Sequence, residues 1–360
     1  MTDIVLDAHL DIAMNHVAYG RDFRNATWKT HHIEGKYPGA PYEGNGVAAV
    51  GLPDMLLGRV AITFGTLWVN PGTSNFDLSL SYETPQQAYE QAIRQIDYYH
   101  RLGDEDDRIR LIRAQSELQS VLDSWGPETD FSDHKLGLVV LMEGADPIIE
   151  PKQVEEWYER GVRIVGPAWQ QTRYAAGTGA PGRLTSLGRE LLEVMGDLNM
   201  ILDLSHLAEE AYFEAIEAYD GPLFASHSNP RRFVETDRQL SDDMIRRLAE
   251  RDSVMGIVAY NRFLKDGWQP GSDKKSDVNV SVMLDMIDHV CQITGSARHV
   301  GIGTDWDGGF GWESIPVPFD SHIDLWHIRE YLLKREYGPE DVSSILSGNF
   351  LRILKQGLPT

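Results

Sequence analysis

Short apolar runs alternate with longer amphipathic segments along most of this chain. The apolar runs predict strands at residues 3–8, 46–50 together with 60–68, 136–142, 162–168, 199–204, 222–225, 253–259 and 298–303. The amphipathic segments predict helices at 84–102, 115–124, 151–160, 185–197, 208–219, 241–251, 279–294 and 322–335. This alternation is typical of repeated βα units and therefore of a parallel sheet.

About eight such units in 360 residues favour a (β/α)8 barrel of the TIM type. The continuous apolar run 138–142 suits a strand that is buried on both faces. The alternative is a doubly wound open sheet, which would bind ligands at a switch point. We predict one catalytic barrel domain over residues 1–360.

Two segments lack clean periodicity, residues 22–45 and 265–278. Each follows a strand end, so each could cover a site as a lid or serve as a plain surface connection. The helix at 241–251 has a clear start, because Ser241 is a good N-cap and acids follow it.

Metal-binding residue types recur at the ends of the predicted strands. His9 and Asp11 are two apart in an extended segment, so both side chains point to one face. Glu143 follows five apolar residues, where a carboxylate needs a cationic partner such as a metal ion or an arginine. His206 and His227 suit a metal through imidazole nitrogen, although each alone could be a core histidine. The five together make a metal centre the first hypothesis.

Ligands at the ends of the first, third, fifth and sixth strands favour the closed barrel, because an open sheet would hold them too far apart. Asp305 ends the last predicted strand and suits a general acid or base beside metal-activated water. For Asp305 and Asp307, turn formation and helix capping are the alternatives.

Composition narrows the class of partner. Acidic residues outnumber basic ones, 55 to 33, for a formal charge of −22, so nucleic acid and anionic membranes are poor partners. The single cysteine, Cys291, lies in an apolar stretch and reads as a core thiol. With neither a signal-peptide pattern nor a membrane-length apolar run, we expect a cytoplasmic protein without membrane contact.

The chain resembles the membrane dipeptidase (renal dipeptidase, peptidase M19) family of metal-dependent hydrolases. The resemblance covers nearly the whole length. The segments that carry it are 7–11, 52–53 with 60–64, 143–144, 203–206, 226–229, 288–290, 299–308 and 348–352.

The resemblance implies a role for each matching residue. His9 and Asp11 match the ligands of one metal, Glu143 a carboxylate bridging two metals, and His206 and His227 the ligands of the second. Arg238 matches the arginine that binds the substrate's terminal carboxylate, which a planar guanidinium grips bidentately. Asp305 matches the catalytic aspartate, and Tyr260 falls near a pocket tyrosine. Family members often form dimers, so the resemblance makes a homodimer possible, although no segment of the sequence identifies an interface.

Trp169 departs from the family pattern, because a histidine that contacts the scissile carbonyl usually stands there. Indole donates one hydrogen bond but cannot become a cation. Losing an oxyanion partner costs about 100- to 1000-fold in turnover unless a neighbour such as Gln170, Gln171 or Arg173 compensates.

We therefore expect a hydrolase that holds two divalent ions, with zinc as the first choice, and cleaves dipeptides. In this reading the ions activate a bridging water, Asp305 moves its proton, and Arg238 holds the substrate carboxylate. One alternative substrate is another small amide or ester, such as an N-acyl amino acid or a lactone, because of Trp169. A metal-binding protein without hydrolytic activity is a further alternative.

Overall fold

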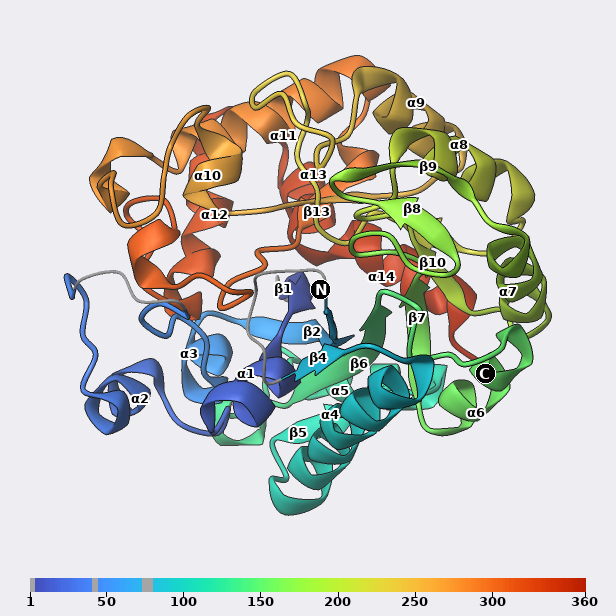
Figure 1. Cartoon of the computed structure of the whole chain (residues 1–360). Helices are drawn as coiled ribbons and strands as arrows, with labels where there is room; N and C mark the ends of the chain where they lie inside the picture. The colour runs from blue at the N-terminus through green and yellow to red at the C-terminus, as the bar shows by residue number, and fades with distance from the viewer. Residues whose placement is uncertain (1–3, 41–44, 73–79) are drawn as a thin grey trace.

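The computed structural model describes residues 4–40, 45–72 and 80–360, and its strands form a ring (Figure 1). Eight parallel strands follow one another in the order β11-β10-β7-β6-β2-β1-β13-β12. A parallel bridge between Ala225 and Met255 joins the two ends of this order. The result is the nearly closed (β/α)8 barrel that the sequence predicts.

The barrel strands match the predicted runs closely, with one exception described below. They are β1 (Val5–Leu10), β2 (Val60–Trp68), β6 (Leu136–Glu143), β7 (Val162–Gly166), β10 (Ile201–Asp203), β11 (Leu223–Phe224), β12 (Met255–Ile257) and β13 (Val300–Ile302). All their residues are buried, because the ring's interior and the surrounding helices cover both faces. Smaller strands are β3 (Asn70–Pro71), β4 (Ser81–Tyr82), β5 (Ile109–Leu111), β8 (Ala175–Gly177) and β9 (Ala180–Leu184).

Helices surround the ring of strands (Figure 1). The predicted segments correspond to α4 (Pro85–Glu105), α5 (Gln115–Asp123), α6 (Val154–Glu159), α7 (Ser186–Asp197), α8 (Glu209–Ala218), α9 (Asp242–Glu250), α11 (Ser281–Thr294) and α12 (His327–Lys334), and α4 extends beyond the predicted end at residue 102. The Ser241 hydroxyl accepts the Met244 N–H at 3.3 Å, so the predicted N-cap of α9 is confirmed. Helices not predicted are α1 (Ile12–Tyr19), α2 (Thr27–Glu34), α3 (Leu52–Leu57), α10 (Asn261–Leu264), α13 (Pro339–Ser343) and α14 (Asn349–Gly357).

The predicted strand at 46–50 is wrong, because this buried segment is irregular. Its backbone N–H groups bind side chains instead of a neighbouring strand. Ala49 and Val50 donate to Asp307 at 2.9 and 3.2 Å, and Val47 donates to Glu313 at 3.0 Å. The segment therefore covers the Gly-rich loop that follows β13.

The two segments expected to be irregular are partly so. Residues 22–45 contain helix α2, while the prediction for residues 41–44 falls outside the described residues. Residues 265–278 are mostly coil and contain a one-turn helix at Lys275–Asp277. Within the described ranges, no helix combines the length and apolar character needed to cross a bilayer.

Candidate metal centre and active site

Residues at the carboxyl ends of the barrel strands line a cavity of about 710 Å³. Every barrel strand contributes one, because parallel strands all end at the same mouth of a barrel. They are Asp11 after β1, Trp68 ending β2, Glu143 ending β6, Trp169 after β7, His206 after β10, Arg238 beyond β11, Tyr260 after β12 and Asp305 after β13. The predicted site residues thus lie together, with His9 and His227 buried beside the cavity.

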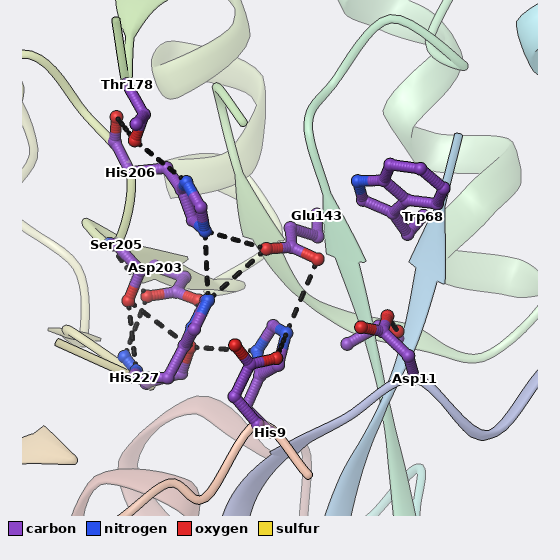
Figure 2. A network of polar contacts seen from close by, with 12 residues as sticks. His9, Asp11, Trp68, Glu143, Thr178, Asp203, Ser205, His206 and His227 are labelled. Atoms are coloured by element: carbon purple, nitrogen blue, oxygen red, sulfur yellow. Dashed lines mark hydrogen bonds and ion pairs between the residues drawn. The ribbon is translucent and has the colours of Figure 1, made fainter. Parts of the chain in front are cut away.

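Glu143 lies at the centre of the three histidines (Figure 2). One carboxylate oxygen, Oε2, is 3.4 Å from Nε2 of His9. The other, Oε1, is 3.1 Å from Nε2 of His206 and 3.3 Å from Nε2 of His227. One oxygen of the carboxylate therefore faces the nitrogen of His9, and the other faces the nitrogens of His206 and His227.

The side chains form two ligand sets that share Glu143. His9, Asp11 and Glu143 have ligand atoms within 4.8 Å of one another, and so do Glu143, His206 and His227. Asp305 joins His9 and His227 in a third such group. Nε2 of His9 is buried and has no hydrogen-bond partner in the described structure. An orphaned imidazole nitrogen facing carboxylates fits a divalent cation.

The crowded carboxylates repel one another in this buried place. Burial, reinforced by the charge of Glu143, raises the pKa of Asp11 to about 7. Burial also raises the pKa of Asp305 well above its usual value, with Asp11 and Glu143 adding to the rise. A cation would relieve this repulsion and keep both groups ionised.

The histidines divide into two electrostatic classes. Burial disfavours the charged form of His9, but Glu143, Asp305 and Asp11 outweigh it and raise its pKa to about 9. Burial and the nearby Arg238 lower the pKa of His206 to about 4. Burial, then His9 and Arg238, holds the pKa of His227 well below its ordinary value. His206 and His227 are therefore neutral, as a metal ligand must be.

Two site residues adopt left-handed backbone conformations that non-glycine residues rarely occupy. His206 has φ +67° and Asp305 has φ +60°. Such strain persists where the surrounding structure fixes it, and it gathers at functional sites. Beside them, a side chain at Gly308 would overlap the carboxylate of Asp305, so the close approach requires glycine.

Arg238 is buried at the cavity wall with part of its guanidinium anchored. Nη2 donates to the His227 carbonyl at 2.7 Å, and Nη1 donates to the Ser228 hydroxyl at 3.1 Å. Its Nε atom has no hydrogen-bond partner among the described residues. The anchored cation thus retains donor capacity for an anionic ligand.

Trp169 forms an aromatic corner with Trp68. Their rings meet edge to face at 5.1 Å, and Trp169 lies 6.2 Å from the ring of His206. Gln170 also lines the cavity, whereas Arg173 donates to the carbonyls of Ile148 and Ile149. Of the residues expected to compensate for the missing histidine, only Gln170 therefore lies at the cavity.

Several residues that position the cluster went unassigned in the sequence analysis. Thr66 donates to Asp11, Thr178 bonds to His206, and Asp203 and Ser226 lie behind His227. Asp203 and Ser226 had a signal, since each is a polar residue in an apolar run just before a histidine. Asp7, two residues before His9, accepts hydrogen bonds from the backbone N–H and the hydroxyl of Thr304.

Comparison with known proteins identifies the family. The profile of the membrane dipeptidase family, peptidase family M19, matches residues 2–357. The chain belongs to this family. It is accordingly a metal-dependent dipeptidase by class, as the resemblance of its motifs implies.

Three similar proteins share between 21% and 26% of their residues with this chain. An uncharacterized dipeptidase of Schizosaccharomyces pombe is 26% identical over 289 residues, which are 78% of this chain and 66% of that protein. A dipeptidase crystal structure of family M19 superposes with a TM-score of 0.79 at 22% identity and covers 100% of both chains. A metallopeptidase from Rhodobacter sphaeroides, crystallised with a phosphinate mimic of L-Ala-D-Ala, gives 0.78 at 21% identity, covering 99% of this chain and 100% of that one. At these identities the two structures establish the fold.

Proposed function

We propose that this chain hydrolyses dipeptides that carry a free carboxylate, with two divalent ions, zinc first, bound in its cavity. One observation supports this above all: Glu143 presents its two oxygens to two separate sets of imidazole nitrogens. His9, Asp11 and Glu143 would hold one ion, and Glu143, His206 and His227 the other. Such a pair supplies an activated water and polarises the scissile carbonyl.

The remaining roles fall to the chain's own residues. Arg238 would bind the substrate carboxylate through its unused donors, which fixes the peptide in the cavity. Asp305 has Oδ1 4.0 Å from Nε2 of His9, so it faces the space between the ligand sets. There it would accept a proton from the attacking water and return it to the leaving amine. The R. sphaeroides structure, of the same fold, supports a substrate of dipeptide size.

The test is metal depletion and reconstitution with a measured zinc content. Dipeptide hydrolysis should vanish in chelator and reach its maximum near two ions per chain. Asp305→Asn, which suits the left-handed backbone, should keep its zinc yet lose roughly 100- to 10,000-fold in kcat. Full activity in the metal-free protein, or in metal-loaded Asp305→Asn, would contradict the proposal.

A second candidate is hydrolysis of another small amide or ester, such as an N-acyl amino acid or a lactone. Trp169 favours it, because an indole in place of the family's histidine cannot supply a cation to a developing oxyanion. The aromatic corner of Trp68 and Trp169 also offers an apolar surface to an acyl chain.

Substrate screens of the wild type and Trp169→His separate the two candidates. If dipeptides are the substrate, Trp169→His should retain or raise kcat/KM for them. If acyl substrates are preferred, the wild type should favour them and Trp169→His should shift the ratio toward dipeptides. A variant with an unchanged ratio would show that Trp169 does not set the substrate class.

A further inference from the structure

One hydroxyl lies behind two of the three histidines. Oγ of Ser226 is 2.8 Å from Nδ1 of His227 and 3.3 Å from Nδ1 of His9. The same Oγ is 2.5 Å from Oδ2 of Asp203 and 3.3 Å from the Ser205 hydroxyl. Ser226, Asp203, His9 and His227 are all buried, so water cannot replace these partners freely.

The carboxylate of Asp203 fixes the direction of the hydrogen bond that Ser226 makes to it, and the directions of the others are inferred from that. As a carboxylate, Asp203 can only accept, and its Oδ1 already accepts the backbone N–H groups of Ser205 and Ser226 at 3.0 and 2.9 Å. The single hydroxyl proton of Ser226 therefore goes to Oδ2. Its two lone pairs can then accept Nδ1–H from the two imidazoles, provided that the neighbouring Ser205 hydroxyl directs its own proton elsewhere. In the neutral form of each ring Nε2 then keeps its lone pair, and in each ring Nε2 is the atom that faces Glu143.

The position of Ser226 is itself set by close backbone packing. Side chains at Gly256 or Gly303 would overlap the Ser226 carbonyl oxygen. The backbone of Ser226 is therefore fixed against β12 and the end of β13, and its hydroxyl is held by the hydrogen bond to Asp203. His206 has a different partner, because its Nδ1 lies 2.9 Å from the hydroxyl of Thr178.

We propose that Ser226, oriented by Asp203, is a shared positioning residue that sets the tautomer of one histidine in each of the two ligand sets. This proposal rests on the two-ion centre proposed above. A ligand's other ring nitrogen commonly has its own carboxylate or backbone partner. Here a single serine contacts a histidine of each ligand set. Its loss should therefore weaken the binding of both ions together.

The first test compares zinc affinities of folded variants by competition with a chelating dye. Ser226→Ala should lower the zinc affinity of both ligand sets by roughly 10- to 100-fold. Thr178→Val should weaken chiefly the ion held by His206, because Thr178 contacts that ring alone among the histidines. The matched control is Ser253→Ala, a fully buried serine whose hydroxyl donates to the Leu223 carbonyl at the other end of β11. It should lose stability and keep both affinities.

Asp203→Asn tests the direction of the hydrogen bonds. The two backbone N–H groups require the amide oxygen at the Oδ1 position, so the NH2 group would point at Ser226. The serine would then turn its proton toward an imidazole Nδ1, and that ring would carry its proton on Nε2. We expect the zinc content to fall from two ions toward one.

A spectroscopic measurement on the zinc-loaded wild type does not depend on any variant folding. With histidine-selective ¹⁵N labelling, His9 and His227 should both show a protonated, slowly exchanging Nδ1. In Ser226→Ala both Nδ1–H signals should shift or exchange quickly, while the Nδ1 signal of His206 stays unchanged.

The outcomes separate this inference from the function on which it rests. A wild type that binds no metal would overturn the proposed function. A wild type with two ions, but with Nδ1 of His9 or His227 unprotonated, would overturn the role of Ser226 alone. The role of Ser226 would also be overturned if Ser226→Ala lowered the affinity for one ion only, or for neither.

Discussion

At the scale of single residues, the site combines groups that the sequence reveals with groups that it hides. His9, Asp11, Glu143, His206 and His227 could be proposed because charged or imidazole side chains are unusual directly after apolar strands. Thr178 and Trp68 could not, because a threonine in a hairpin and a tryptophan ending an apolar run look ordinary. Their roles depend on three-dimensional neighbours, His206 and Trp169, that no local pattern encodes.

Arg238 yields a prediction of its own. Arg238→Lys keeps the charge but loses the planar fork, so KM for dipeptides should rise about tenfold or more while kcat changes less. Dipeptide amides, which lack the carboxylate, should be turned over equally poorly by both proteins. Arg231→Lys is the control, because Arg231 pairs with Glu209 and is not a lining residue of the cavity. Equal losses on dipeptides and their amides would argue against a carboxylate contact.

At the scale of elements, the strands were predictable because both of their faces are buried and their runs are short and apolar. Residues 46–50 carry the same apolar signal for another reason. They are buried under a loop, and the carboxylates that satisfy their N–H groups lie more than 250 positions away. Helix α2 was missed for the opposite reason, since it leaves Trp28 and Ile33 exposed and has no apolar stripe.

Alanine substitutions at two glycines should change the free energy of unfolding in opposite directions. Gly303→Ala would push a methyl group into the Ser226 carbonyl oxygen, so it should lower the free energy of unfolding by about 3 kcal/mol. Gly196→Ala, near the end of α7, would meet only Tyr219 at 3.8 Å and should raise it by about 0.5 kcal/mol. Urea unfolding of the two variants checks both signs. Similar effects in the two would mean that close packing at Gly303 is not the cause.

At the scale of the whole molecule, the buried charges of the cluster link stability to metal and pH. His9 has its pKa raised to about 9, against burial, by Glu143, Asp305 and Asp11. A raised pKa means that the folded protein binds this proton more tightly than the unfolded chain does. The resulting stabilisation is complete below about pH 6.5 and is lost as the pH rises through about 9.

We therefore predict that the metal-free protein loses stability on the order of 2 kcal/mol between pH 6.5 and pH 9. The zinc-loaded protein should be more stable throughout and flatter over this interval, because a bound cation takes the place of the proton on His9. Chemical unfolding at the two pH values, in chelator and in zinc, measures the difference. Parallel pH profiles in the two conditions would exclude this linkage.

The pairing of β1 with β13 also determines the order in which the parts of the site can assemble. Asp7 accepts hydrogen bonds from Thr304, a residue 297 positions later, so β1 lacks one of its two neighbours until the last barrel strand exists. During synthesis His9 and Asp11 leave the ribosome before the other site residues. The strand that carries them, β1, pairs with β13 only after nearly the whole barrel has been made. All five proposed ligands have been made before Asp305, and Asp305 arrives with the strand that completes the ring. Asp305, the residue proposed to move the proton, therefore cannot take its place in the site before β13 completes the barrel.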